Sequence, residues 1–118
     1  YEKYIGISTT DTAAILVLSR MYYETADYRK SANNYSKLEF RTLNETDRFN
    51  AGIAYLRLAE SQPDKAGRNY ISAFQYLSSV GDTQKTKDYI ASIYKKMAEF
   101  YYNSGDYNKV GEIIKNYL

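Results

Sequence analysis

A tyrosine followed four residues later by a small residue recurs along this chain, and three copies of this pattern limit the possible folds more than any other feature of the sequence. The three copies are Tyr22 with Ala26, Tyr55 with Ala59, and Tyr101 with Gly105. In the first and third copies an Asp-Tyr pair follows at once, which indicates that one helix ends and another begins there. A helical hairpin cannot bury its apolar face alone, so we expect repeated hairpins to stack into an array.

Apolar residues recur at intervals of three and four in six segments, which is the period of amphipathic helices. The segments are 12–26, 27–38, 44–58, 61–77, 82–102 and 106–118. Residues suited to capping stand at the helix starts, namely Asp27, Asn44, Ser61, Asp82 and Asp106. Alternation typical of strands is weak throughout, and residues 1–8 fit either the end of an earlier helix or a lead-in. The sequence therefore predicts an all-α fold.

Tyrosine dominates the aromatic content, with 15 Tyr, 4 Phe and no Trp. A tyrosine ring is buried readily while its hydroxyl requires a partner or water, so we expect many half-exposed rings. Tyr22 and Tyr101 are predicted to belong to the core. Gly52 within a helix costs about 1 kcal/mol relative to alanine, which predicts that another helix packs closely there.

The repeat resembles the tetratricopeptide repeat family, whose units of about 34 residues pair two antiparallel helices. The first copy reads Leu18-Ser19-x-x-Tyr22-x-x-x-Ala26-Asp27-Tyr28-x-x-Ser31-x-x-x-Tyr35-x-x-Leu38, and the third reads Met97-Ala98-x-x-Tyr101-x-x-x-Gly105-Asp106-Tyr107-x-x-Val110-x-x-x-Ile114. The second begins Ala51-Gly52-x-x-Tyr55-x-x-x-Ala59 and then departs, because Ser61 to Pro63 lengthens its turn. The resemblance implies a right-handed superhelical stack of three hairpins in one domain, 1–118, with repeats at about 11–43, 44–80 and 82–118.

In this family a ligand groove runs along the first helix of each hairpin. The resemblance implies a groove for a peptide or protein segment, with tyrosines as rigid anchors and Asn50 bonding to peptide backbone. At each position the alternative is an ordinary solvated helix face. The residues placed in the groove are Arg20, Tyr23, Glu24, Asn50, Ile53, Arg57, Lys96, Glu99, Tyr102 and Asn103.

Some members of this family grip a C-terminal carboxylate with Lys, Asn and Arg side chains. Asn50 and Lys96 occupy two of those positions here, and Arg20 stands where an asparagine is usual. Leu16 and Ser92 replace two of the expected lysines. The clamp is incomplete, so we do not expect a ligand held in this way.

Composition excludes several other functions. The net charge is only +2, with both signs interspersed, so neither nucleic acid nor anionic lipid is an expected partner. The chain has no His and no Cys, which removes the usual proton shuttle, thiolate nucleophile and metal ligands. Its glycines form no phosphate-binding loop. We therefore expect no enzyme activity, no cofactor and no metal. The longest apolar run, residues 13–18, is too short to span a bilayer.

The last predicted helix is apolar on much of its surface, through Val110, Ile113, Ile114, Tyr117 and Leu118. We expect further repeats in a longer parent protein, a second copy, or the partner to cover it. The chain begins at Tyr1 and not at Met, which also suggests a piece of a longer protein. The sequence predicts a non-catalytic scaffold that binds a peptide or protein. The alternative is a structural component of a bacterial cell-envelope or outer-membrane assembly complex, so the compartment, cytoplasm or periplasm, stays open.

Overall fold

The computed structural model describes residues 12–63, 66–81 and 83–117. Within them lie six α-helices and one short 3₁₀-helix, and none of these residues belongs to a strand. The elements are α2 (Thr12–Glu24), α3 (Tyr28–Tyr35), the 3₁₀-helix η1 (Phe40–Thr42), α4 (Glu45–Ser61), α5 (Ala66–Ser78), α6 (Gln84–Asn103) and α7 (Tyr107–Tyr117). The all-α prediction is confirmed for this part of the chain. Residues 1–8, which the sequence left open, lie outside it.

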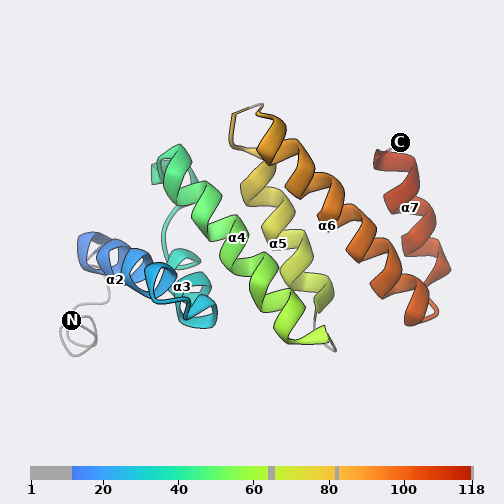
Figure 1. The fold of residues 1–118 in the computed structure, drawn as a ribbon, viewed down its shortest axis with the longest axis horizontal. Coiled ribbons are helices and arrows are strands. Elements are labelled where there is room, and N and C mark those ends of the chain that lie inside the picture. Colours follow the sequence, from blue (N-terminus) through green and yellow to red (C-terminus); the bar gives the residue numbers. More distant parts are fainter. Residues whose placement is uncertain (1–11, 64–65, 82, 118) are drawn as a thin grey trace.

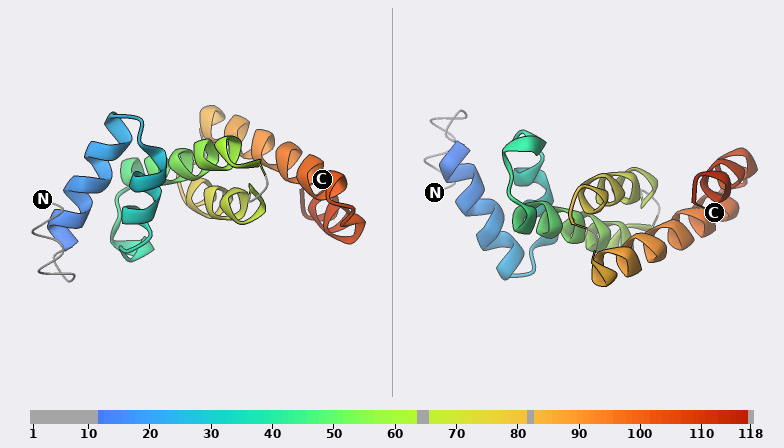
Figure 2. Two further views of the ribbon diagram at one scale, coloured as in Figure 1. Left: turned by 90° about the horizontal axis from the view of Figure 1, so that it is seen from below. Right: turned by 90° about the horizontal axis from the view of Figure 1, so that it is seen from above.

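The helices follow one another in a row from α2 to α7 (Figure 1). Most contacts between helices join neighbours along the sequence, and α2 also touches α4. In both side views of Figure 2, α4 and α6 lie on one side of the row and α5 and α7 on the other. The molecule measures 45 × 30 × 22 Å, so the two ends of the row are far apart.

The α2–α3 turn and the α6–α7 turn have the same backbone hydrogen bonds. The Asp27 N–H donates to the Tyr22 carbonyl at 2.8 Å, and the Asp106 N–H donates to the Tyr101 carbonyl at 2.9 Å. In each turn the preceding residue donates to the carbonyl three positions earlier, which completes a Schellman motif. The two turns are thus equivalent, as the sequence repeat predicts.

In both turns the residue before the aspartate has a left-handed backbone: φ is 63° at Ala26 and 80° at Gly105. This conformation costs an L-residue roughly 1–2 kcal/mol, whereas glycine loses about 0.5–1 kcal/mol in chain entropy. We therefore expect Ala26→Gly to raise the free energy of unfolding by roughly 0.5–1 kcal/mol, and Gly105→Ala to lower it similarly. Urea denaturation measures both changes, and effects of the same sign would contradict the expectation.

Three of the predicted helix caps are confirmed. Asp27, Asn44 and Asp106 each accept, through a side-chain oxygen, a hydrogen bond from the backbone N–H three residues further on. Such caps satisfy N–H groups that have no partner within the helix. They fix the starts of α3, α4 and α7.

Two predicted helix starts differ from the structure. Ser61, predicted to cap the partner helix, is the last residue of α4, and its hydroxyl donates to the Leu58 carbonyl at 2.9 Å. The next helix, α5, begins at Ala66. The cap of α6 is Thr83, whose hydroxyl accepts the N–H three residues on, whereas Asp82 lies outside the described residues.

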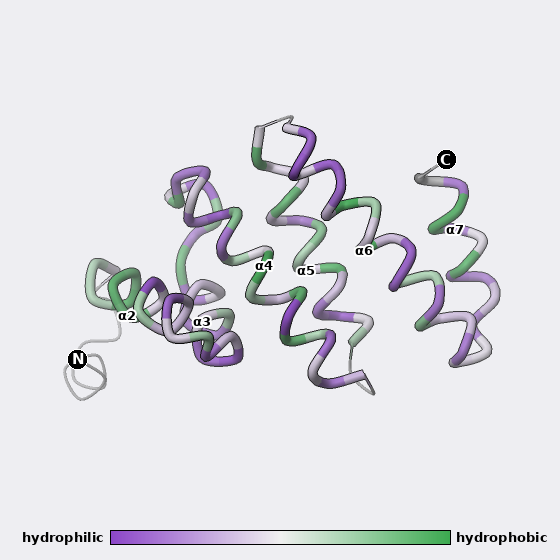
Figure 3. Tube along the Cα trace, in the orientation of Figure 1, coloured by the Kyte–Doolittle hydropathy of each residue, from purple (hydrophilic) through white to green (hydrophobic). Residues whose placement is uncertain are grey.

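Two apolar clusters form the core of the part of the chain that the structure describes. Hydrophobic residues recur along every helix with hydrophilic residues between them (Figure 3). One cluster joins α2, α3 and the first half of α4 through Ala14, Ile15, Leu18, Tyr35, Leu38, Leu43 and Ala51. The larger one joins α4 to α7 through Ile53, Leu56, Ala59, Ala66, Tyr70, Ala73, Leu77, Ile93, Met97 and Ile113. Helix α4 therefore contributes to both.

Gly52 marks a close approach between α4 and α5, as its position in the helix predicts. A Cβ atom added at Gly52 would lie 2.7 Å from Leu77 Cγ and 3.3 Å from the Ala73 carbonyl oxygen. Leu77 is fully buried, so this contact lies in the larger core cluster. Gly52 therefore weakens the helix at a position where a side chain would have no room.

Several tyrosine rings are half-buried, which confirms the expectation from composition. Burial raises the pKa of Tyr23, Tyr55 and Tyr70, and it raises the pKa of Tyr76 to about 12. The ring of Tyr76 stacks on that of Tyr55, with centroids 5.7 Å apart and planes inclined by 15°. These rings are held in their neutral form.

The raised pKa values predict a loss of stability in alkali. An unfolded tyrosine ionises near pH 10, whereas folded Tyr76 keeps its proton to about pH 12. The stability gained from neutral tyrosines is therefore complete below about pH 10 and declines above it. We expect the urea midpoint to fall above about pH 10, and to fall less steeply in Tyr76→Phe. If the urea midpoint fell equally steeply with pH in the wild type and in Tyr76→Phe, this role of Tyr76 would be contradicted.

Candidate functional site

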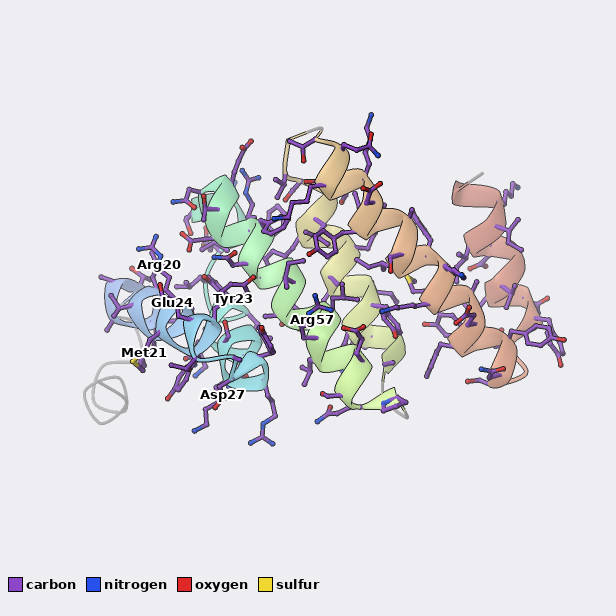
Figure 4. All side chains as sticks on the ribbon, in the orientation of Figure 1. Arg20, Met21, Tyr23, Glu24, Asp27 and Arg57 are labelled. Atoms are coloured by element: carbon purple, nitrogen blue, oxygen red, sulfur yellow. The ribbon has the colours of Figure 1, made fainter. Side chains whose placement is uncertain are left out.

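The ten residues predicted to line a groove lie on α2, α4 and α6, the first helix of each predicted hairpin. Figure 4 shows Arg20, Tyr23 and Glu24 on α2, with Arg57 on α4. Glu24 is exposed and Asn50 is half-buried. Ile53, expected on the exposed side, is only 4% exposed and belongs to the larger core cluster. Its apolar side chain serves packing, and that expectation is wrong.

Arg20 is engaged in a three-residue network at the junction of α2, α3 and α4. Its guanidinium donates two hydrogen bonds to the carboxylate of Asp47, at 2.9 Å and 2.7 Å. The hydroxyl of fully buried Tyr35 donates to the same carboxylate at 3.1 Å. The hydrogen bonds from Arg20 hold the pKa of Asp47 below its usual value, although burial opposes them. Asp47 is therefore charged, and Arg20 is its partner.

A second ion-pair network joins α4 to α6. Glu60 accepts from Arg57 at 2.8 Å and from Lys96 at 2.5 Å. Burial raises the pKa of Glu60, but the hydrogen bonds from Lys96 and Arg57 outweigh it, so the net shift is downward. Every cation of the predicted groove, including Arg20, is thus paired with a carboxylate of this chain.

Tyr23 on α2 is half-buried against neighbouring helices. Its ring lies edge-on to Tyr28, with centroids 5.8 Å apart, and it packs against the larger core cluster. Burial raises the pKa of Tyr23; nearby Tyr28 and Tyr89 add to this effect and Arg57 opposes it. The N-terminal members of the predicted groove are therefore largely occupied in holding helices together.

Two open hollows lie on either side of the C-terminal half of α6. The first, of about 340 Å³, lies between α4, α5 and α6 and is lined by Ala59, Glu60, Pro63, Ala66, Tyr70, Lys96, Glu99, Phe100 and Asn103. The second, of about 490 Å³, lies between α6 and α7 and is lined by Ala98, Glu99, Tyr102, Asn103 and Val110. All four predicted α6 residues line at least one hollow, and Glu99 and Asn103 line both.

Glu99 and Asn103 form a polar ridge between these hollows, one helical turn apart on α6. Glu99 is exposed and has no ion-pair partner among the described residues, unlike the cations of the predicted groove. Tyr102, beside the ridge, is 61% exposed. We call Lys96, Glu99, Tyr102 and Asn103, with the two hollows, the α6 surface.

Sequence patterns missed the residues that complete the α6 surface. Glu60 was not among the predicted site residues, yet it pairs with Lys96, 36 positions away. Tyr70, a member of the larger core cluster, and Phe100, which packs against that cluster, also form walls of the first hollow. Only tertiary packing brings these residues together. A further hollow of about 560 Å³ lies near Gly67, Phe100 and Tyr101, and it contains none of the predicted site residues.

The described residues show no group of three or more acidic, His or Cys side chains able to hold a metal ion. None of their helices combines the length and apolar character that crossing a bilayer requires. We find no family model, no curated protein and no solved structure that matches this chain.

Proposed function

We propose that this chain is a non-catalytic scaffold that binds a protein or peptide segment on its α6 surface. The observation that carries the proposal is the pair of open hollows that share Glu99 and Asn103. Clefts lined by apolar walls with a few polar groups are the usual form of binding sites. The three paired cations argue against a ligand held by its carboxylate.

The α6 surface would recognise a segment with apolar side chains and a nearby cation. Apolar side chains of the partner would enter the hollows, whose walls include Ala98, Phe100 and Val110. The carboxylate of Glu99, which has no ion-pair partner among the described residues, would accept hydrogen bonds from a Lys or Arg, and the Asn103 amide would bond to backbone. Tyr102 would supply contact area at a low cost in conformational entropy.

We propose further that the hairpins form a tetratricopeptide-like superhelical stack. Support comes from the equivalent turns of the first and third hairpins and from one shared aromatic contact. Tyr23 and Tyr28 meet edge-on at 5.8 Å and 74°, and their counterparts Tyr102 and Tyr107 meet edge-on at 5.5 Å and 66°. Determining an experimental structure and superposing the three hairpins would test the stack.

Affinity capture with matched charge reversals tests the binding proposal. Wild type, Glu99→Lys and Glu24→Lys would each be immobilised and exposed to an extract of the source cells. Both glutamates are exposed on first helices of hairpins, so the two variants differ only in the surface that they alter. We expect Glu99→Lys to lose proteins that wild type and Glu24→Lys retain. Identical captured proteins in all three samples would remove the α6 surface as the binding site, and loss in Glu24→Lys alone would move the site to α2.

A further inference from the structure

We propose that copies of this chain associate head to tail, with the outer face of α7 in one copy packed against the outer face of α2 in the next. This goes beyond the scaffold function, because it uses neither hollow of the α6 surface. Two observations support it: a face of α7 that is uncovered although its counterpart in α3 is covered, and an exposed apolar strip at the opposite end of the molecule.

The first observation follows from the equivalence of the two hairpins. Because Tyr22 and Asp27 correspond to Tyr101 and Asp106, Tyr35 of α3 corresponds to Ile114 of α7. Tyr35 is fully buried and bonds to Asp47 of α4, so α4 lies over this face of α3. Ile114 at the same position is 49% exposed.

A neighbouring position on the same helices shows the same difference. Ala32, three residues before Tyr35, is buried, whereas its counterpart Gly111 is exposed. A Cβ atom added at Gly111 would meet no atom within 4 Å. We define the outer face of α7 by Gly111 and Ile114. This face is apolar, and Gly111 leaves room on it for another helix. A helix could therefore pack on α7 as α4 packs on α3.

The second observation is the apolar strip on α2. Val17 and Met21, one helical turn apart, are 44% and 45% exposed. Met21 extends from α2 on the side away from α4 (Figure 4). Helices α2 and α7 stand at opposite ends of the row (Figure 1), so both faces are accessible at once.

A second copy fits both faces together. Burial of Ile114 against Val17 and Met21 would remove apolar surface from water, and the absence of a side chain at Gly111 permits close approach of the helices. The exposed charges beside the two faces, Lys115 and Glu24, have opposite signs. Because the two faces differ, the contact is heterologous and would generate open chains of copies.

Analytical ultracentrifugation with two variants tests this arrangement. We expect the average mass of the wild type to rise with concentration between the micromolar and millimolar ranges. Met21→Lys and Ile114→Lys should each remain monomeric, because each lacks one of the two faces. Mixed together they should form one-to-one dimers, since Met21→Lys keeps the α7 face and Ile114→Lys keeps the α2 face. Gln75→Lys, which alters an exposed residue of α5, should assemble like the wild type.

The mixing step separates a lost face from a lost fold, because only two folded variants can complement each other. A wild type that stays monomeric at every concentration would overturn the proposal and leave the α7 face to a different protein. Variants that assemble like the wild type, or a mixture that remains monomeric, would also overturn it.

Discussion

Replacement of Asp47 by alanine is expected to lower the free energy of unfolding by about 3 kcal/mol. The side chain of Asp47 is only 3% exposed, and it accepts hydrogen bonds from Arg20 and Tyr35. Its removal leaves the hydroxyl of buried Tyr35 without an acceptor, which costs about 1–3 kcal/mol. The loss of the Arg20 contacts destabilises the protein less than the loss of a fully buried ion pair would, because that arginine side chain is 47% exposed. Urea denaturation at neutral pH measures the effect.

Glu24→Ala is the matched control, because it removes an exposed carboxylate from α2 and should change stability by less than about 0.5 kcal/mol. The lowered pKa of Asp47 adds a pH test. Stability from this carboxylate is present above its unfolded pKa, near 3.8, and is lost as pH falls toward the lower folded value. Asp47→Asn should therefore lose less stability on acidification than wild type. If both proteins lost the same stability on acidification, Asp47 would not be the carboxylate whose protonation destabilises the fold.

Tyr101→Ala is expected to lower the free energy of unfolding by at least about 2 kcal/mol. The ring is half-buried at the edge of the larger core cluster and meets Phe100 edge-on, with centroids 5.1 Å apart. Its hydroxyl lies over Gly67 of α5, within 2.8 Å of where a Cβ would stand. Truncation would leave a cavity between α5 and α6, and denaturation in urea would reveal its cost.

Tyr102→Ala provides the comparison, since it removes the same atoms from the adjacent position. Tyr102 is exposed and touches Tyr107 edge-on, so its truncation should cost less than about 1 kcal/mol. Equal midpoints for wild type and Tyr101→Ala would place Tyr101 outside the core. They would also remove the main support for a third hairpin packed like the first.

The sequence was informative wherever local chemistry determines structure. The caps at Asp27, Asn44 and Asp106 depend on a hydrogen bond three residues away, and the short range of that contact makes it readable from spacing. Ser61 was misread because serine suits either end of a helix, and its hydroxyl bonds backwards to Leu58. The first and third turns were predictable, whereas the start of the helix that follows the second turn was not.

Sequence spacing does not show which residues distant along the chain come together. Arg20 resembled a ligand-binding cation until its partner Asp47, 27 positions away, was located. The periodicity that placed Ile53 on a groove cannot tell a solvent-facing position from one that another helix covers. By contrast, Lys96, Glu99 and Asn103, which the resemblance placed in the groove, all line the first hollow.

The preference of each helix for its neighbours in sequence has a kinetic consequence. Most native contacts close short loops, so little chain entropy is spent before the first contacts form. Such connectivity favours rapid folding from several starting points. Local unfolding should begin at the outermost helices. The backbone amides of α4, which is shared by both core clusters, should exchange with solvent most slowly.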